Sequence, residues 1–351
     1  MEWVHRLLAW YRHHQRQLPW RDDPSPYRVW VSEIMLQQTR VVAVQPYFAR
    51  FLARFPSLES LAAADQEEVL KVWEGLGYYS RARNLHQAAR QVVAERGGRI
   101  PASSVELAEL PGVGPYTAAA IASIAFGEAT PVVDGNVLRV VARHRAWRED
   151  IAAARTRNRV RASLEEAIAE SGAPSSFNQA MMELGALVCT PRQPQCAVCP
   201  LAGDCRALAE GLVAELPVKR KRGAVPCYEI AVGLVFDGEL VFIARRGEDQ
   251  MLGGLWEFPG GKREGAESLA ETCLREVREE VGLTVAVEEE ICTVDHAYSH
   301  FAIRLTAFRC RLAGPVAELC CERPTRWVRL DQLRELPFPK ANHKIFAALG
   351  M

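Results

Sequence analysis

Four cysteines close the first half of the chain with the spacing C-x6-C-x2-C-x5-C: Cys189, Cys196, Cys199 and Cys205. Thiolates this close together in the sequence can surround one metal centre. Zinc and iron–sulfur clusters both accept four cysteines, so the spacing does not distinguish between them. Two disulfides or a set of buried thiols are the alternatives, and disulfides are uncommon in reducing compartments. The loop 189–205 is therefore predicted to hold a metal centre.

A glycine-containing turn, Leu110-Pro111-Gly112-Val113-Gly114, precedes an alanine-rich stretch with helical character. Gly112 and Gly114 allow a tight turn that brings backbone N–H groups close to a phosphate at a helix N-terminus. The segment of about 106–125 is thus predicted to be a helix-hairpin-helix that binds DNA without regard to sequence. Many helix–helix turns use glycine, so the motif alone is weak evidence.

A third pattern lies in the second half, where residues 261–283 fit G-x5-E-x7-R-E-U-x-E-E-x-G-U (U apolar) at every specified position. This is the pattern of the Nudix box. Glu276, Glu279 and Glu280 stand at i, i+3 and i+4, on one face of a helix. Their oxygens could hold Mg²⁺ against a diphosphate.

Hydrophobic periodicity divides the chain into two domains. Apolar residues recur at helical spacing up to about residue 212, which predicts an all-α domain over 1–212. Prolines and a run of basic residues indicate a linker over 213–226. β-branched and alternating runs interrupted by two helical stretches predict an α+β domain over 227–351.

Composition is that of an ordinary folded protein, with 49% hydrophobic and 25% charged residues and no net charge. The balance hides an asymmetry, because residues 1–225 hold 28 Lys and Arg against 23 Asp and Glu. A DNA-facing first half is compatible with this excess. No apolar run is long enough to span a membrane, and the first residues lack a signal-peptide pattern. A cytoplasmic protein with no membrane partner is expected.

Together these motifs resemble a known group of enzymes. The hairpin, the aspartate in "VDGNV" and the cysteines spaced 6-2-5 resemble the endonuclease III superfamily of DNA glycosylases. "SEIMLQQT" and "GLGYYSRARN" are similar to segments of the MutY-type adenine DNA glycosylases, which remove adenine mispaired with 8-oxoguanine. The resemblance covers nearly the whole chain.

The resemblance implies a helix-hairpin-helix glycosylase domain with a [4Fe–4S] cluster on the four cysteines, followed by a Nudix-like domain that recognises 8-oxoguanine. It further implies a monomer acting near the nucleoid on double-stranded DNA with A:8-oxoguanine or A:G mispairs. The cluster loop would present Arg192 and Arg206 to DNA phosphate.

Two carboxylates in different environments could divide the work of breaking an N-glycosidic bond. Glu33 lies in the apolar segment "VWVSEIML", where burial would raise its pKa and keep it protonated near neutral pH. We expect it to protonate adenine N7 and then to activate water. Asp134 precedes a helix expected near Asn136, whose N-terminus favours the ionised form. It would stabilise the sugar cation, by charge or by a transient covalent bond.

By resemblance, Asn136 and Tyr116 orient this site. Related enzymes that also cleave the strand carry a lysine where Tyr116 stands, so a glycosylase without lyase activity is expected. A surface glutamate at position 33 and an ordinary helix cap at position 134 are the structural alternatives.

Base removal implies that adenine leaves the duplex. By resemblance, Gln38 and Tyr78 enter the helix beside the lesion, and Trp20, Arg21 and Gln179 line the adenine pocket. The further expected DNA contact is Thr39. The loop Tyr298-Ser299-His300 stands where the family usually has Phe-Ser-His and is expected to read 8-oxoguanine.

Three other functions compete with this one. The C-terminal domain could additionally be a Mg²⁺-dependent Nudix hydrolase, because its box is intact where that of familiar adenine glycosylases is eroded. An enzyme acting on oxidised pyrimidines is opposed by the missing lysine. A DNA-binding protein without catalysis is opposed by the presence of both Glu33 and Asp134.

Overall fold

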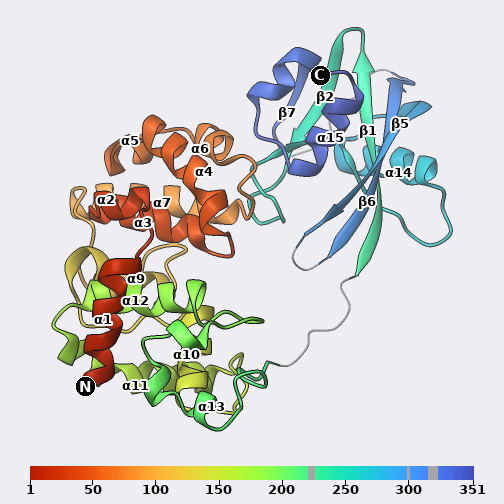
Figure 1. The fold of residues 1–351 in the computed structure, drawn as a ribbon. Helices are drawn as coiled ribbons and strands as arrows, with labels where there is room; N and C mark the ends of the chain where they lie inside the picture. Colours follow the sequence, from red (N-terminus) through yellow and green to blue (C-terminus); the bar gives the residue numbers. More distant parts are fainter. Residues whose placement is uncertain (220–225, 299–300, 315–322) are drawn as a thin grey trace. The chain divides into compact units, whose positions relative to one another are not determined.

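The computed structural model describes residues 1–219, 226–298, 301–314 and 323–351. The chain forms two compact units, each described by itself below (Figure 1). The first unit comprises Met1–Ala62 and Gln87–Arg222, and the second comprises Ala63–His86 and Gly223–Met351. Of the expected linker, residues 220–225 lie outside the described part of the chain.

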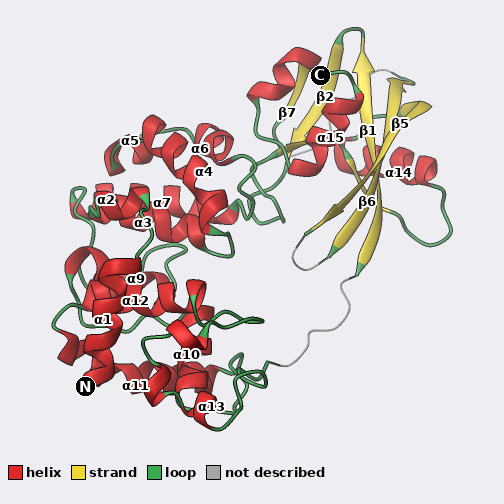
Figure 2. Ribbon diagram, in the orientation of Figure 1, coloured by secondary structure: helices red, strands yellow, loops and turns green. Residues whose placement is uncertain are grey.

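The described part of the first unit is helical, as predicted (Figure 2). Its helices are α1 (Glu2–His14), α2 (Pro19–Asp22), α3 (Pro26–Leu36), α4 (Val41–Arg54), α5 (Leu58–Ala62), the later part of α7 (Ser80–Arg96), α8 (Ser104–Leu107), α9 (Pro115–Phe126), α10 (Gly135–His144), α11 (Ala154–Ser171), α12 (Pro174–Leu187) and α13 (Arg206–Ala209), with 3-10 turns η1 (Cys196–Val198) and η2 (Ala202–Asp204). Within the described residues, no helix combines the length and apolarity needed to cross a membrane.

One hydrophobic core holds α1, α10, α11 and α12 together. Buried side chains at helical spacing supply it, among them Leu7 of α1, Val141 of α10 and Phe177 of α12. Helix α12 comes so close to α10 that a Cβ at Gly185 would lie 2.5 Å from the Cβ of Asn136. Only glycine permits this close approach, which places α12 against the first turn of α10 at the site described below.

The described part of the second unit contains α6 (Gln66–Trp73), the first turns of α7 and a seven-stranded mixed sheet. The strand order is β3-β2-β1-β6-β5, with β4 paired to β1 and β7 paired to β2. The strands are β1 (Cys227–Asp237), β2 (Leu240–Arg245), β3 (Trp256–Glu257), β4 (Gly260–Lys262), β5 (Val285–Ala297), β6 (Ala302–Leu312) and β7 (Thr325–Arg329). Only the β1–β6 pair is parallel among these pairings.

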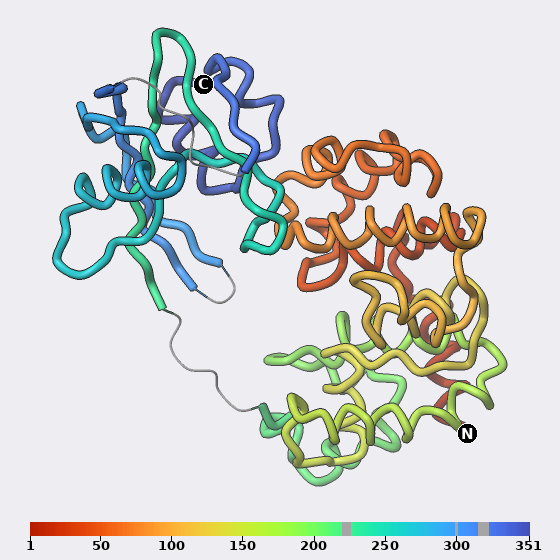
Figure 3. The backbone as a smooth tube through the Cα atoms, turned by 180° about the vertical axis from the view of Figure 1, so that it is seen from behind, coloured from red at the N-terminus to blue at the C-terminus, as the bar shows by residue number. Residues whose placement is uncertain are grey.

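Two helices pack on the sheet, each through its own cluster of apolar side chains. Cys273, Val277 and Val281 of α14 (Leu269–Val281) pack in one cluster, and Ile345 and Phe346 of α15 (Lys340–Ala348) pack in the other. The 3-10 turn η3 (Leu330–Glu335) adds Leu333 to the second cluster. Figure 3 traces the same sheet and helices from behind. The predicted order of an all-α part followed by an α+β part is confirmed.

Candidate active site and DNA interface

A cavity of about 820 Å³ lies in the first unit. Glu33 reaches it from α3, Tyr116 from α9, Asp134 from the start of α10 and Asn136 from the first turn of α10. These residues lie far apart in the sequence, and the packing of three helices brings them to one surface. The cavity is therefore the part of this unit where acid–base chemistry could occur.

Glu33 is 5% exposed, with apolar neighbours on its own helix. Burial raises the pKa of its carboxyl to about 7, although the Tyr116 hydroxyl donates a hydrogen bond to Oε2 at 3.1 Å and lowers it. The nearby charge of Asp134 raises this pKa further. A carboxyl in this state can give a proton near neutral pH.

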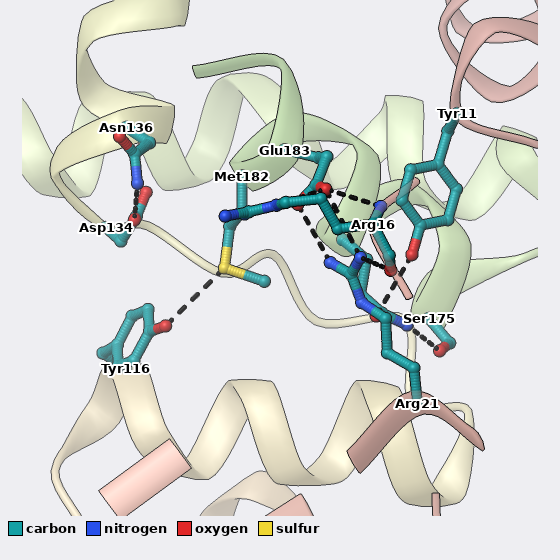
Figure 4. A network of polar contacts seen from close by, with 10 residues as sticks. Tyr11, Arg16, Arg21, Tyr116, Asp134, Asn136, Ser175, Met182 and Glu183 are labelled. Atoms are coloured by element: carbon teal, nitrogen blue, oxygen red, sulfur yellow. Dashed lines mark hydrogen bonds and ion pairs between the residues drawn. The ribbon is translucent and has the colours of Figure 1, made fainter. Parts of the chain in front are cut away.

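Asp134 caps α10 through its side chain, whose Oδ1 accepts a hydrogen bond from Val137 N–H at 2.7 Å. Its Oδ2 accepts from Asn136 Nδ2 at 2.7 Å (Figure 4). Burial raises the pKa of Asp134, and these two hydrogen bonds act in the opposite direction. Both donors favour the charged form, but burial is the larger effect and the pKa of Asp134 is raised, as is that of Glu33. The two carboxyl groups differ in their hydrogen bonds: Asp134 accepts two, and Glu33 accepts one from Tyr116.

Asn136 is itself fixed by Arg139, which donates from Nη2 to Asn136 Oδ1 at 2.8 Å. The same guanidinium donates to the carbonyl oxygens of Gly185 and Cys189. Asp134, Asn136 and Arg139 thus form a chain of hydrogen bonds that ends at the first cysteine of the 189–205 loop.

Helix α12 forms the opposite wall of the cavity with Ser175, Gln179, Met182 and Glu183. Gln179 Oε1 accepts hydrogen bonds from Arg21 Nε at 2.8 Å and from the Tyr11 hydroxyl at 3.1 Å. Trp20 also lines the cavity and meets Phe48 edge to face at 5.3 Å. The sequence-predicted pocket residues Trp20, Arg21 and Gln179 are therefore placed on the same cavity as Glu33.

Sequence reasoning missed Glu183, the ionic centre of this wall (Figure 4). Its side chain is 1% exposed and binds Arg16 and Arg21 at 2.8 and 3.1 Å. Burial raises the pKa of Glu183, but the hydrogen bonds from both arginines outweigh this and hold it at about 2. Met182 was missed as well, and its sulfur lies 3.6 Å from the Tyr116 hydroxyl. The spacing of residues 175, 179, 182, 183 and 186 on one helix face was the available signal.

The predicted hairpin lies between α8 and α9, where Val113 N–H donates to Leu110 O at 3.1 Å. Gly112 has a φ of +74°, the left-handed backbone that favours glycine. Gly114 is the N-cap of α9, and a Cβ there would meet no atom within 4 Å. Leu110 and Val113 are buried while both glycines are exposed, so the turn is anchored with its backbone accessible.

Two residues expected to enter DNA have unusual backbones. Gln38 of the first unit has a φ of +58° and Tyr78 of the second unit a φ of +50°, although neither is glycine. Such strain concentrates at functional sites. Gln38 is exposed, Tyr78 is half-buried, and Thr39 lines the 820 Å³ cavity.

The four cysteines are free thiols that line one small cavity, together with Arg143. Arg143 Nη1 lies 3.4 Å from Cys189 Sγ, where its charge would offset that of metal-bound thiolates. Among the described residues, no three His, Cys, Asp or Glu side chains are grouped as ligands of a single ion would be. The assignment of a metal centre rests on the cavity that the four cysteines line together and on their spacing in the sequence.

The Nudix-box helix α14 begins with a capping box formed by Ser268 and Glu271. Arg275 pairs with Glu276 and Glu279 at 2.9 and 3.0 Å, and Arg323 pairs with Glu280 at 3.3 Å. Each of the three predicted metal-binding carboxylates therefore has an arginine partner. Arg275 also pairs with Glu267, and Arg323 also pairs with Glu257, so two arginines are shared among five carboxylates.

Tyr298, the residue after β5, stacks on Phe301 with the ring centres 4.8 Å apart. Its backbone N–H donates to Phe301 O at 2.8 Å. The other two residues of the expected lesion-reading loop, Ser299 and His300, lie outside the described residues.

Comparison with known protein families agrees with this architecture. Residues 31–169 match the family model of the HhH-GPD superfamily base excision DNA repair protein, and residues 189–205 match the iron-sulfur binding domain of endonuclease III. Residues 231–348 match the NUDIX domain. An iron–sulfur cluster is therefore the metal centre of the cysteine loop.

Similar proteins were found along nearly the whole chain. The adenine DNA glycosylase of Mus musculus is 36% identical over 97% of this chain and 76% of its own length. That of Homo sapiens is 35% identical over 97% of this chain and 72% of its own length. A solved thermostable thymine-DNA glycosylase is 28% identical with a TM-score of 0.52, covering 60% of this chain and 96% of its own.

A trapped endonuclease III–DNA covalent intermediate shares the fold, with a TM-score of 0.51 over 60% of this chain and 96% of its own, at 24% identity. Fold and site thus define an iron–sulfur DNA glycosylase of the helix-hairpin-helix type, a base-excision repair enzyme that binds DNA. Within this class, the chain belongs to the adenine DNA glycosylase family.

Proposed function

We propose that this protein hydrolyses the N-glycosidic bond of adenine mispaired with 8-oxoguanine or guanine in double-stranded DNA. The single observation that carries the proposal is the buried Glu33, whose pKa is raised to about 7, on one cavity with Asp134. The names of the relatives support adenine as the base removed.

The reaction begins with adenine in the cavity of about 820 Å³, after the base has left the duplex. Glu33 protonates N7, and the bond between C1′ and N9 breaks with its electron pair on the base. Asp134 stabilises the positive charge that develops on the sugar. Ionised Glu33 then takes a proton from water as the water oxygen bonds to C1′, which restores the acid.

Strand cleavage is not part of this proposal. A lyase reaction needs an amine that attacks C1′, and Tyr116 supplies none. Among the described residues that line the cavity there is no lysine. We propose a monofunctional glycosylase that acts as a monomer near the nucleoid.

The remaining expected parts have separate roles. The domains are proposed to be 1–212 and 227–351, joined by a linker over 213–226.

The iron–sulfur centre is proposed to be a [4Fe–4S] cluster on the four cysteines, where it would order the loop that presents the exposed Arg192 and Arg206 to phosphate. Gln38 and Tyr78 would fill the space left by adenine, and Tyr298 would help to read 8-oxoguanine.

Single-turnover base release tests the proposal on duplexes with A opposite 8-oxoguanine, A opposite G, and thymine glycol. We expect adenine release from the first two duplexes, and strand breaks only after alkali treatment. Strand breaks without alkali would contradict the monofunctional mechanism. Preferred release of thymine glycol would contradict the substrate.

A second candidate activity is Mg²⁺-dependent hydrolysis of nucleoside diphosphate bonds by the second unit. It is favoured by the complete Nudix box. It is also favoured by the position of Glu280 beside the buried Glu257, because both carboxylates form an ion pair with Arg323. The pairing of Glu276, Glu279 and Glu280 with arginines favours a structural role instead. Pyrophosphate release from 8-oxo-dGTP by the full chain, lost in the Glu279→Gln variant, would establish the hydrolase.

A further inference from the structure

A second cavity, of about 460 Å³, lies within the second unit. Tyr78 forms one side, and Tyr298 with Phe301 forms another. Both tyrosines are proposed above to act at the mispair, and the inference below rests on that proposed function. The third side is the turn Gln250–Leu252, which has no assigned role.

This turn is held firmly against residues 66–83 of the same unit. Arg83 donates to the carbonyl oxygens of Gly253 and Glu248, and Gln66 Nε2 donates to Glu248 Oε1 at 2.8 Å. A Cβ at Gly253 would lie 2.5 Å from Gly247 O, so the turn is closed as tightly as glycine allows. The side chains of the turn are therefore presented from a fixed backbone.

Two features of the turn Gln250–Leu252 indicate that it could bind a ligand. Leu252 has a φ of +61°, a conformation that is strained for any residue with a side chain. Met251 is 55% exposed although its side chain is apolar. Backbone strain concentrates at functional sites, and the exposed thioether beside it offers an apolar contact to a ligand in the cavity.

The hydrogen bond that Gln250 accepts determines which end of its side-chain amide is left for a ligand. Gly247 N–H, which can only donate, donates to Gln250 Oε1 at 3.2 Å. The amide oxygen must therefore face the backbone, and the NH2 group points away from it. Among the contacts of the described residues, none occupies the hydrogens of Gln250 Nε2, and Gln250 is exposed at the cavity. The turn thus offers a hydrogen-bond donor beside an apolar thioether.

These two groups match an oxidised purine better than an ordinary one. 8-Oxoguanine carries a carbonyl oxygen at C8, where guanine has only a hydrogen atom. A planar base can stack on the aromatic faces of Tyr78 and Tyr298, and a thioether packs well on such rings.

We propose that the turn Gln250–Leu252 is a third wall of the site for the base opposite adenine. Gln250 Nε2 donates a hydrogen bond to O8 of 8-oxoguanine, and Met251 packs on the base. Gln250 is thereby a specificity-determining residue that distinguishes 8-oxoguanine from guanine.

The test measures the affinity of the full-length protein for duplexes that carry non-hydrolysable 2′-fluoro-2′-deoxyadenosine opposite 8-oxoguanine, 8-bromoguanine or guanine. Gln250→Met removes the donor at similar size, and it also removes the acceptor of the Gly247 N–H, whose loss the duplexes without a carbonyl oxygen at C8 report. We expect its affinity for the 8-oxoguanine duplex to fall about five- to tenfold, as for one lost hydrogen bond. Affinities for the other two duplexes should change less than about twofold, because neither base has a carbonyl oxygen at C8.

Gln332→Met is the matched control, because Gln332 is also an exposed glutamine whose Oε1 accepts a hydrogen bond from a backbone N–H, and it does not line the cavity. This variant should retain the preference of the wild-type protein. Equal losses on all three duplexes would show a general DNA contact or a folding defect and would overturn the inference. An unchanged preference in Gln250→Met would also overturn it.

The Tyr298→Ala variant separates this inference from the proposed function. If Tyr298→Ala loses the preference for 8-oxoguanine and Gln250→Met keeps it, only the role of the turn is wrong. If the wild-type protein shows no preference for 8-oxoguanine over guanine, the proposed lesion recognition itself fails.

Discussion

The Tyr116 hydroxyl donates a hydrogen bond to Glu33 Oε2 at 3.1 Å across 83 positions of sequence. This contact joins the start of α9 to the last turn of α3 and orients the carboxyl at the cavity. It also lowers the pKa of Glu33, yet burial is the larger effect and the pKa stays at about 7. The carboxyl that we propose as the acid is thus oriented at the cavity and is about half protonated at neutral pH.

Loss of the acid should stop catalysis without stopping binding. Glu33→Gln keeps the size of the side chain but cannot transfer a proton, so single-turnover adenine release should slow by at least about 10³-fold. Affinity for the duplex with A opposite 8-oxoguanine should stay within about threefold, because the amide keeps the shape of the carboxyl. Full activity of this variant would refute the mechanism.

The rate should depend on pH through the same group. In the proposed mechanism the protonated form of Glu33 is the active one, and its pKa is about 7. The single-turnover rate should therefore fall about tenfold per pH unit well above this pH. It should also fall at low pH as Asp134, whose pKa is raised by burial, loses the charge that stabilises the sugar cation. Rates measured from pH 5 to 9 with saturating enzyme test this. A rate that rises through pH 7 would exclude Glu33 as the acid.

Glu33 should also limit stability at high pH. Its folded pKa is raised from 4.5 to about 7, so the folded protein keeps a proton that the unfolded chain has lost. The contribution of protonated Glu33 to the free energy of unfolding is fully present below pH 4.5 and is lost as pH rises through about 7. Glu33→Gln should therefore be more stable than the wild type by about 1–3 kcal/mol at pH 8. At pH 4.5 this advantage should disappear, and thermal unfolding at both values measures the difference.

Glu183 should have the opposite effect. Its pKa is held at about 2, so its contribution is present above pH 4.5 and is lost as pH falls through about 2. Glu183→Gln leaves Arg16 and Arg21 without a carboxylate and should cost about 3 kcal/mol of unfolding free energy at pH 7. Glu2→Gln, which breaks the exposed pair with Arg6, should cost less than about 0.5 kcal/mol. Equal costs in denaturant unfolding would contradict the central role of Glu183.

Gly185 should be needed for activity although it carries no functional group. In Gly185→Ala, the new Cβ would meet Asn136 at 2.5 Å and displace the hydrogen bond from Asn136 to Asp134. A shift of this kind can reduce the rate of adenine release about 10²-fold. Gly203→Ala is the control, because a Cβ there meets no atom within 4 Å. Equal activity of the two variants would show that α12 moves to accept the methyl group.

Loss of one cluster ligand should affect folding and binding together. Cys199→Ser should lower the iron content and the melting temperature and should weaken DNA binding, because the loop 189–205 would lose its centre. Cys227→Ser, at an exposed thiol outside the loop, should behave as the wild type. A Cys199→Ser protein that stays stable and binds DNA but loses catalysis would contradict this role.

Much of the fold was predictable from local patterns. Helical periodicity and the shift to β-branched runs determine the all-α and α+β parts, because burial selects one face of each element. The hairpin turn follows from Gly112, whose left-handed backbone few other residues tolerate. Short elements such as β3 and β4 were not predicted, because two or three residues carry no periodic signal.

Sequence by itself determined the chemical types present: two carboxylates, four spaced cysteines, a tyrosine in place of a lysine and a complete Nudix box. Only the tertiary structure decided how these groups behave. Burial raised the pKa of Glu33, while Arg16 and Arg21 lowered that of Glu183. The reason is physical, because desolvation and charge pairing depend on neighbours from distant segments. The sequence names the ionisable groups, and the folded packing sets their protonation states.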